Sequence, residues 1–162
     1  MKKKLCFVFL ASSMMIGCSQ SMWLHPVKGQ LSTQTPPPVL TAKLTGNRSG
    51  SISITLSDGE MYKGRWARVP YLKTPRGANR VHSSTTDDMS SAWDAVYWTG
   101  FYKSNVLNAG FYAQAVVSGN RGSVLHVEIY QESPSTDGTV FSTVGLAKDD
   151  KGNIYKMNYD SL

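Results

Sequence analysis

Apolar and polar residues alternate along several short segments of this chain, and turn residues separate the segments. Ile52, Ile54 and Leu56 alternate with serine and threonine, and Asp58-Gly59 follows them. Strict alternation is typical of a strand with one buried face, and Asp-Gly between two such segments favours a tight hairpin. We therefore expect a hairpin here, with its second strand over 60–69.

The second half of the chain repeats this alternation in segments separated by glycine-rich or polar turns. Four further strands are expected there: 111–117, 125–130, 139–146 and 154–159. Many short strands at such intervals predict a mainly β fold, either an antiparallel β-sandwich or a small barrel of about six to eight strands. Gly46-Asn47-Arg48 and Gly119-Asn120-Arg121 each precede an alternating strand, which reflects either an internal duplication or a recurring turn sequence.

One segment has helical spacing instead. Met89, Ala92, Trp93 and Val96 follow one another at intervals of three and four residues, which indicates one short helix over about 87–98. The alternative is an aromatic strand that continues beyond this segment. The aromatic residues of the region are expected to be core, with a sugar-stacking platform as the alternative. They are Trp93, Tyr97, Trp98, Phe101 and Tyr102.

The first eighteen residues have a different pattern. A basic start at 2–4 is followed by an apolar run over 5–11 and then by Met15-Ile16-Gly17-Cys18. The run is shorter than the roughly 20 residues that span a bilayer, which favours a removable secretory signal. The whole segment resembles the signal peptide and lipobox of bacterial lipoproteins. That resemblance implies cleavage before Cys18, acylation of its sulfur and, because a serine follows, anchoring in the outer membrane facing the periplasm.

The chain is accordingly expected to have three parts: a signal peptide over 1–17, the lipidated Cys18 with a flexible tether over 18–38, and a single β-rich domain over 39–162. Serine, threonine, glutamine and proline dominate the tether, and three consecutive prolines near its end favour polyproline II. Trp23 and Leu24 are its apolar exceptions. They are expected to dock on the domain, to enter the membrane interface, or to be an incidental pair.

Charge and cysteine content indicate which partners and which stabilising bonds to expect. The formal net charge is +6, but without the three lysines of the signal 14 basic residues face 11 acidic ones. This mild excess does not indicate a nucleic-acid binder. Of the two cysteines, Cys6 lies in the signal and Cys18 would be acylated, so the domain is expected to lack disulfides and to be stabilised by its core.

Residues 61–86 contain six basic residues and no acidic one, with aromatic residues among them. Arginine pairs with phosphate and aromatic faces stack on sugars, so this stretch is the candidate surface for an anionic ligand. The alternative is the solvated face of a strand and the loop after it. The candidate residues are Lys63, Arg65, Trp66, Arg68, Tyr71, Lys73, Arg76 and Arg80.

The sequence contains no pattern that indicates catalysis. His82 precedes a serine- and threonine-rich run, which does not suggest the fixed geometry that a nucleophile and its base need. His25 falls in the tether, and His126 is expected on the outward face of a strand. Residues 149–153 are better explained as a turn than as a calcium loop, and no zinc spacing occurs. We expect no enzyme activity, no metal site and no cofactor.

Together these patterns predict a lipid-anchored cell-envelope protein with a non-catalytic binding or structural domain. Its expected partners are the membrane, through the acyl chains, and an anionic envelope polymer or another envelope protein, without nucleic acid. The alternatives are an accessory lipoprotein subunit of a secretion or conjugation assembly and a periplasmic binder similar to an enzyme inhibitor.

Overall fold

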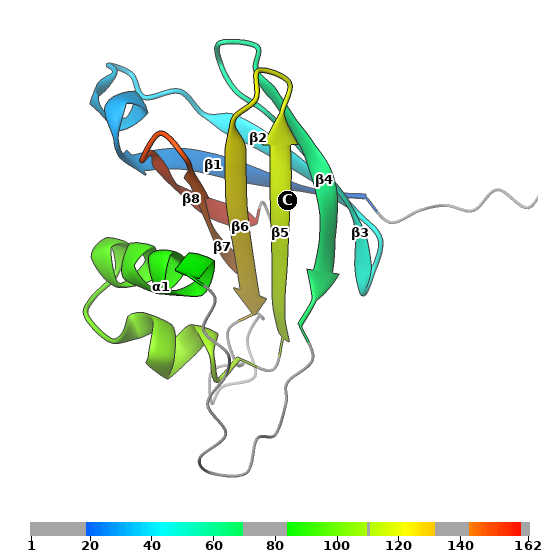
Figure 1. The fold of residues 1–162 in the computed structure, drawn as a ribbon, viewed down its shortest axis with the longest axis vertical. Helices are drawn as coiled ribbons and strands as arrows, with labels where there is room; N and C mark the ends of the chain where they lie inside the picture. Colours follow the sequence, from blue (N-terminus) through cyan, green and yellow to red (C-terminus); the bar gives the residue numbers. More distant parts are fainter. Residues whose placement is uncertain (1–18, 70–83, 110, 132–142, 160–162) are drawn as a thin grey trace, which may run out of the picture.

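Eight antiparallel strands form a closed β-barrel, and one α-helix packs outside it (Figure 1). The computed structural model describes residues 19–69, 84–109, 111–131 and 143–159. The strands are β1 (Ser19–Lys28), β2 (Leu40–Thr45), β3 (Ser49–Thr55), β4 (Met61–Arg68), β5 (Phe111–Gly119), β6 (Val124–Gln131), β7 (Thr143–Asp149) and β8 (Ile154–Tyr159). The predicted mainly β fold of six to eight strands with one helix is confirmed, and of its two forms the structure is the barrel.

Each strand pairs with the next along the chain, and β1 completes the barrel by pairing with both β2 and β8. Met22 of β1 lies opposite Ala42 on one side and Tyr159 on the other. Closure therefore pairs both edges of the sheet, which would otherwise be exposed to other chains. The predicted hairpin at Asp58-Gly59 joins β3 to β4, and Gly59 supplies the positive φ of 82° that the turn requires.

The predicted flexible tether over 18–38 is wrong for Ser19–Lys28, because this segment is strand β1. Leu24 is fully buried inside the barrel, whereas its neighbour Trp23 is 38% exposed on the outer wall. The buried positions of the strand are held by Met22, Leu24 and Pro26, among serine, glutamine and histidine. Such short alternation does not distinguish a strand from a polar linker, so β1 is identified only by its pairing with both neighbours.

Part of the remaining predicted tether also packs on the barrel. A short 3-10 helix, η1 (Gln30–Thr33), follows β1, and Leu31 packs against the barrel core. The chain then leads directly into β2. The barrel therefore already includes Ser19–Lys28, ahead of the predicted domain boundary at residue 39.

Every second residue of each strand points into the barrel, where these side chains form an apolar core. Leu24, Ala42 and Met157 are fully buried there. The second strand of the predicted hairpin follows this alternation: Tyr62 and Trp66 point inward, and the residues between them are exposed apart from the half-buried Gly64. These side chains pack together in the barrel interior, as is usual in a small barrel.

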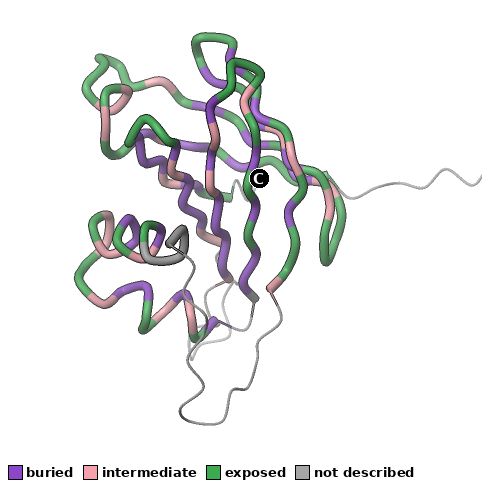
Figure 2. Tube along the Cα trace, in the orientation of Figure 1, coloured by how far each residue is buried: buried purple, intermediate pink, exposed green. Residues whose placement is uncertain are grey.

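The helix predicted over 87–98 is confirmed as α1 (Ser84–Val96), and the alternative of an aromatic strand is wrong. A π-helical turn, η2 (Tyr102–Val106), follows it, and both pack on the outside of the barrel. Strands β6 and β7 have this helical layer on one side and the barrel interior on the other. They are therefore buried along most of their length (Figure 2).

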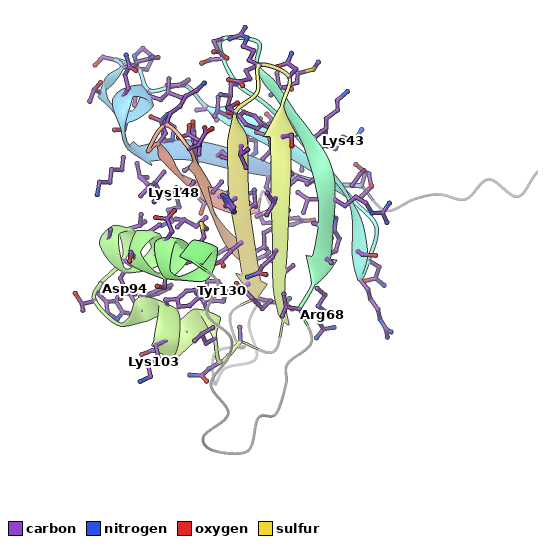
Figure 3. All side chains as sticks on the ribbon, in the orientation of Figure 1. Lys43, Arg68, Asp94, Lys103, Tyr130 and Lys148 are labelled. Atoms are coloured by element: carbon purple, nitrogen blue, oxygen red, sulfur yellow. The ribbon has the colours of Figure 1, made fainter. Side chains whose placement is uncertain are left out.

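Aromatic side chains join the helical layer to the barrel. Trp93 is fully buried and lies edge-on to Tyr130 of β6, with 5.5 Å between the ring centroids (Figure 3). Phe101 and Tyr102 are also buried, as expected for core residues, whereas Trp98 is 56% exposed. This second core lets a domain without disulfides bury large side chains on both faces of one sheet segment.

The two glycine-asparagine-arginine sequences lie at opposite ends of the barrel. Gly46-Asn47-Arg48 joins β2 to β3, and Gly119-Asn120-Arg121 joins β5 to β6. A duplication of half the barrel would place equivalent turns four strands apart, at the same end of the barrel. These two copies are three strands apart, so the strands that follow them, β3 and β6, run in opposite directions. Their placement favours a recurring turn sequence.

Candidate functional site

Buried polar side chains fill one end of the barrel. The carboxylate of Asp149 accepts hydrogen bonds from the backbone N–H of Asn153 at 2.7 Å, from its side-chain amide at 2.7 Å and from the hydroxyl of Tyr155 at 3.0 Å. Burial, with the nearby Asp149 carboxylate, raises the pKa of Tyr155. The segment 149–153 is thus the predicted turn, held by its own aspartate.

A second buried acid lies at the same end. Glu60 is fully buried, accepts a hydrogen bond from the hydroxyl of Ser123, and lies 3.2 Å from Nζ of Lys151. The Ser123 hydroxyl also lies 2.8 Å from the hydroxyl of Tyr62, whose pKa is raised by burial. Because buried polar groups are stable only when hydrogen-bonded, these contacts close this end of the barrel. We call it the closed end.

The opposite end contains a cavity of about 450 Å³, which we call the mouth cavity. Three of its apolar lining residues, Met22, Leu44 and Ile129, lie farther inside the barrel than Gln20 and Gln131. The lining residues within the described segments are Gln20, Met22, Leu44, Gly46, Asn47, Trp66, Ala113, Ile129, Gln131 and Thr143. Its volume falls in the range of roughly 300–1,000 Å³ that is usual for small-molecule sites.

Trp66 is the largest side chain of the mouth cavity, and its orientation is fixed. Its indole N–H donates a hydrogen bond of 2.9 Å to the backbone carbonyl of Thr45, which reaches from β4 across β3 to β2. Gly50 of β3 lies beneath this bond. A Cβ atom at Gly50 would lie 1.5 Å from the Thr45 oxygen, so only glycine leaves room for the contact.

Two arginines stand at this end of the barrel. Arg68 is the last residue of β4, two positions beyond Trp66 on the inward alternation, and it is exposed (Figure 3). Its backbone N–H donates to the carbonyl of Arg48, at 2.9 Å, in the β2–β3 turn. Four acids that the structure describes lie on strands or turns at the closed end: Asp58, Glu60, Asp149 and Asp150. Two of these acids are paired with bases at that end, Asp58 with Arg121 and Glu60 with Lys151, whereas no acid is described in the cavity lining or in the β2–β3 turn beside it.

A third acid, Glu128, is buried on the outer wall beneath α1. Its carboxylate accepts hydrogen bonds from the indole N–H of Trp93 at 2.7 Å and from the hydroxyl of Tyr112 at 2.5 Å. The side-chain amide of Gln114 donates to it at 3.2 Å. Burial raises the pKa of Glu128, and these three hydrogen bonds partly offset that effect.

The structure separates the residues of the predicted anionic-ligand surface. Lys63 and Arg65 are exposed on the outer wall, whereas Trp66, only 5% exposed, points into the barrel. Arg68 stands at the cavity end. Tyr71, Lys73, Arg76 and Arg80 lie outside the described residues, as do Cys18 and His82. The prediction that Trp66 shares a surface with Lys63 and Arg65 is therefore wrong, because strand alternation places the indole on the opposite side of the sheet.

Lys63 is instead part of a polar row that runs across the outer wall. Lys43 on β2 lies opposite Ser53 on β3, and Ser53 lies opposite Lys63 on β4. Neighbouring strands are about 4.8 Å apart, so the two lysines stand on the order of 10 Å apart on one surface. Arg65 follows two residues farther along β4. We call Lys43, Lys63 and Arg65 the outer basic wall.

Two of the three histidines lie on described strands. His25, predicted in the tether, lies in β1, and His126 lies on the outward alternation of β6 as expected. No group of three or more potential ligands suited to a metal ion occurs in the described part of the chain. No helix within these described segments is both long and apolar enough to span a bilayer.

Comparison with known proteins returned no matching family model, no matching curated protein and no matching solved structure. The fold defines the class of protein by itself: an up-and-down eight-stranded barrel with one polar closed end and one end that contains a cavity. The sequence did not indicate the cavity. Its available signal was the run of small inward residues on β5, Ala113 and Ala115, which leaves space beside Trp66.

Proposed function

We propose that this protein is a lipid-anchored, non-catalytic binding module of the cell envelope, and that its ligand binds in the mouth cavity. The observation that carries this proposal is the asymmetry of the barrel. A hydrogen-bonded polar network fills the closed end, whereas the other end contains about 450 Å³ of space with an apolar inner wall. Eight-stranded barrels have an interior that is either filled or able to hold one small ligand.

The chemistry of the lining supports binding rather than turnover. The ten described lining residues are apolar, amide- or hydroxyl-bearing, or glycine, and none of these ten has a side chain that titrates near neutral pH. General acid–base catalysis needs such a group within hydrogen-bonding reach of the substrate. The lining can exclude water from an apolar ligand and offer amide hydrogen bonds at its outer rim.

The test is binding of N-phenyl-1-naphthylamine, a dye whose fluorescence rises in apolar sites, to the full chain reconstituted in nanodiscs. We expect saturable binding above the signal of empty nanodiscs. Ala113→Phe should abolish it by filling the cavity, because Ala113 is 1% exposed on its wall. Ala67→Phe is the matched control, since Ala67 is exposed on the outer wall of the neighbouring strand.

Ala113→Leu is a smaller substitution at the same position, which keeps the test valid if Ala113→Phe does not fold. It should weaken dye binding partially. Unfolding midpoints of all three variants show whether the barrel is intact. Equal dye binding by folded Ala113→Phe and Ala67→Phe would reject the cavity as the site.

A second binding surface is favoured by a separate observation. A depression of about 440 Å³ adjoins the rest of the outer basic wall. Its described lining consists of Lys43, four hydroxyl-bearing residues and two apolar ones: Thr41, Ser53, Thr55, Ser57, Val39 and Leu56. This surface is suited to an anionic envelope polymer or to an acidic face of another envelope protein, including a subunit of a larger assembly.

A further inference from the structure

We propose that the mouth cavity faces the membrane that holds Cys18, and that it takes the acyl chain of an anionic lipid from that membrane. This inference rests on the proposed function and names its ligand. It needs three properties at one end of the barrel: the attachment point, an apolar space and positive charge.

The attachment point lies at the cavity end. Ser19 is the first residue of β1 and lies opposite Thr45, the last residue of β2. Consecutive Cα atoms are about 3.8 Å apart, so a lipid on Cys18 would be joined to the barrel almost directly. Gln20 and Met22, the second and fourth residues of β1, line the cavity. The strand that leaves the membrane is therefore itself one wall of the cavity.

The lining has the chemistry of a lipid site. Met22, Leu44 and Ile129 surround the inner part with apolar atoms, which suits hydrocarbon. Gln20 and Gln131 supply amides nearer the rim, where an ester would lie. An acyl chain could thus enter with its polar portion remaining at the end of the barrel.

Charge selects the head group. Arg48 and Arg68 stand at the cavity end, joined through their backbones, and no acid is described in the cavity lining or in the β2–β3 turn at that end. At the closed end, Asp58 and Glu60 are instead paired with Arg121 and Lys151. Guanidinium groups pair with phosphate through two parallel hydrogen bonds. An anionic phospholipid fits these arginines. The acyl chain of the protein's own anchor could fill the same space, but its diacylglyceryl group carries no phosphate for them.

Orientation is tested first, with the acylated full chain in liposomes. Asn47→Cys places a thiol in the β2–β3 turn at the cavity end, and Ser57→Cys places one in the β3–β4 turn at the closed end; both positions are exposed. Each thiol is labelled with bimane, and spin-labelled lipid head groups are added as quenchers. We expect strong quenching at 47 and little at 57. Equal quenching, or stronger quenching at 57, would overturn the orientation.

The ligand is tested by native mass spectrometry after reconstitution with phosphatidylglycerol or phosphatidylcholine. We expect one bound phosphatidylglycerol per protein, at least tenfold less phosphatidylcholine, loss in Ala113→Phe and retention in Ala67→Phe. Arg48→Gln with Arg68→Gln should remove the preference between the two lipids while leaving dye binding intact. Equal retention of both lipids by the unaltered protein would overturn the anionic preference.

The outcomes separate this inference from the proposed function. Dye binding in the cavity without any bound phospholipid would refute the lipid and leave the proposed function standing. No dye and no lipid binding would refute both. If the dye binds only after the acylated N-terminal residue is removed, the cavity holds the protein's own anchor and the inference fails.

Discussion

The indole N–H of Trp66 donates to the backbone carbonyl of Thr45 at 2.9 Å, across a strand on which Gly50 leaves the path clear. This bond joins three strands at the cavity end and sets one face of the cavity. It also explains why an aromatic residue in the middle of a basic segment is buried rather than available to a surface ligand.

Trp66→Phe should keep an aromatic ring in the cavity wall and lose this hydrogen bond. We expect a loss of about 1–2 kcal/mol in the free energy of unfolding, from the bond and the smaller ring. Denaturant unfolding measures it. Trp98→Phe is the matched control, because Trp98 is 56% exposed and should change stability by less than about 0.5 kcal/mol. Equal effects of the two substitutions would show that the Thr45 contact contributes nothing.

Glu128 should give the protein a measurable pH dependence. Its pKa in the folded state is raised above the usual 4.5 by burial, so the folded protein holds this proton longer than the unfolded chain does. The associated stability is fully present below about pH 4.5 and is lost as the pH rises through the raised pKa.

Glu128→Gln removes this titration while keeping the shape of the side chain. We expect its stability relative to the natural protein to increase between about pH 4.5 and neutrality, as measured by denaturant unfolding at several pH values. A constant difference across this range would show that the carboxyl group keeps an ordinary pKa in the folded state.

Tyr155→Phe should weaken the closed end without opening a cavity. It removes the hydroxyl that lies 3.0 Å from Asp149 and leaves the other donors to that carboxylate in place. We expect a loss of about 1–2 kcal/mol in thermal or denaturant unfolding, with dye binding at the other end unchanged. Tyr159→Phe, on the same strand but 42% exposed, is the control and should be close to neutral.

Lipidation of Cys18 remains a prediction of the sequence. In cells fed radiolabelled palmitate, the natural chain and Cys6→Ser should both incorporate label, because Cys6 lies in the segment expected to be removed. Cys18→Ser should incorporate none and should no longer fractionate with membranes. Labelled Cys18→Ser protein would exclude this anchor.

The outer basic wall gives a prediction distinct from the cavity. Replacement of Lys43, Lys63 and Arg65 by serine should weaken binding of an anionic envelope polymer such as lipopolysaccharide in a pull-down at physiological salt. All three side chains are exposed, so unfolding should be little changed. Arg68→Ser is the comparison, since Arg68 stands at the cavity end. If Arg68→Ser loses polymer binding and the triple variant keeps it, the outer basic wall is not the polymer site.

The local sequence determined most of the individual elements. Alternation identified the hairpin of β3 and β4 and the strands of the second half, and spacing at three and four residues identified α1. These signals are local, because a strand or helix that buries one face must repeat apolar residues at its own period. The charge content and the motif ending at Cys18 were also available from the sequence, and they carry the prediction of a membrane anchor.

Only the tertiary structure decided where those elements meet. The strand β1 has a short apolar pattern, with Met22, Leu24 and Pro26 buried. It is defined by simultaneous pairing with β2 and β8, which are far apart in the chain. The mouth cavity likewise depends on residues from six strands and on the space left beside Trp66. Barrel closure and internal space are properties of long-range packing, so no local pattern of residues could reveal them.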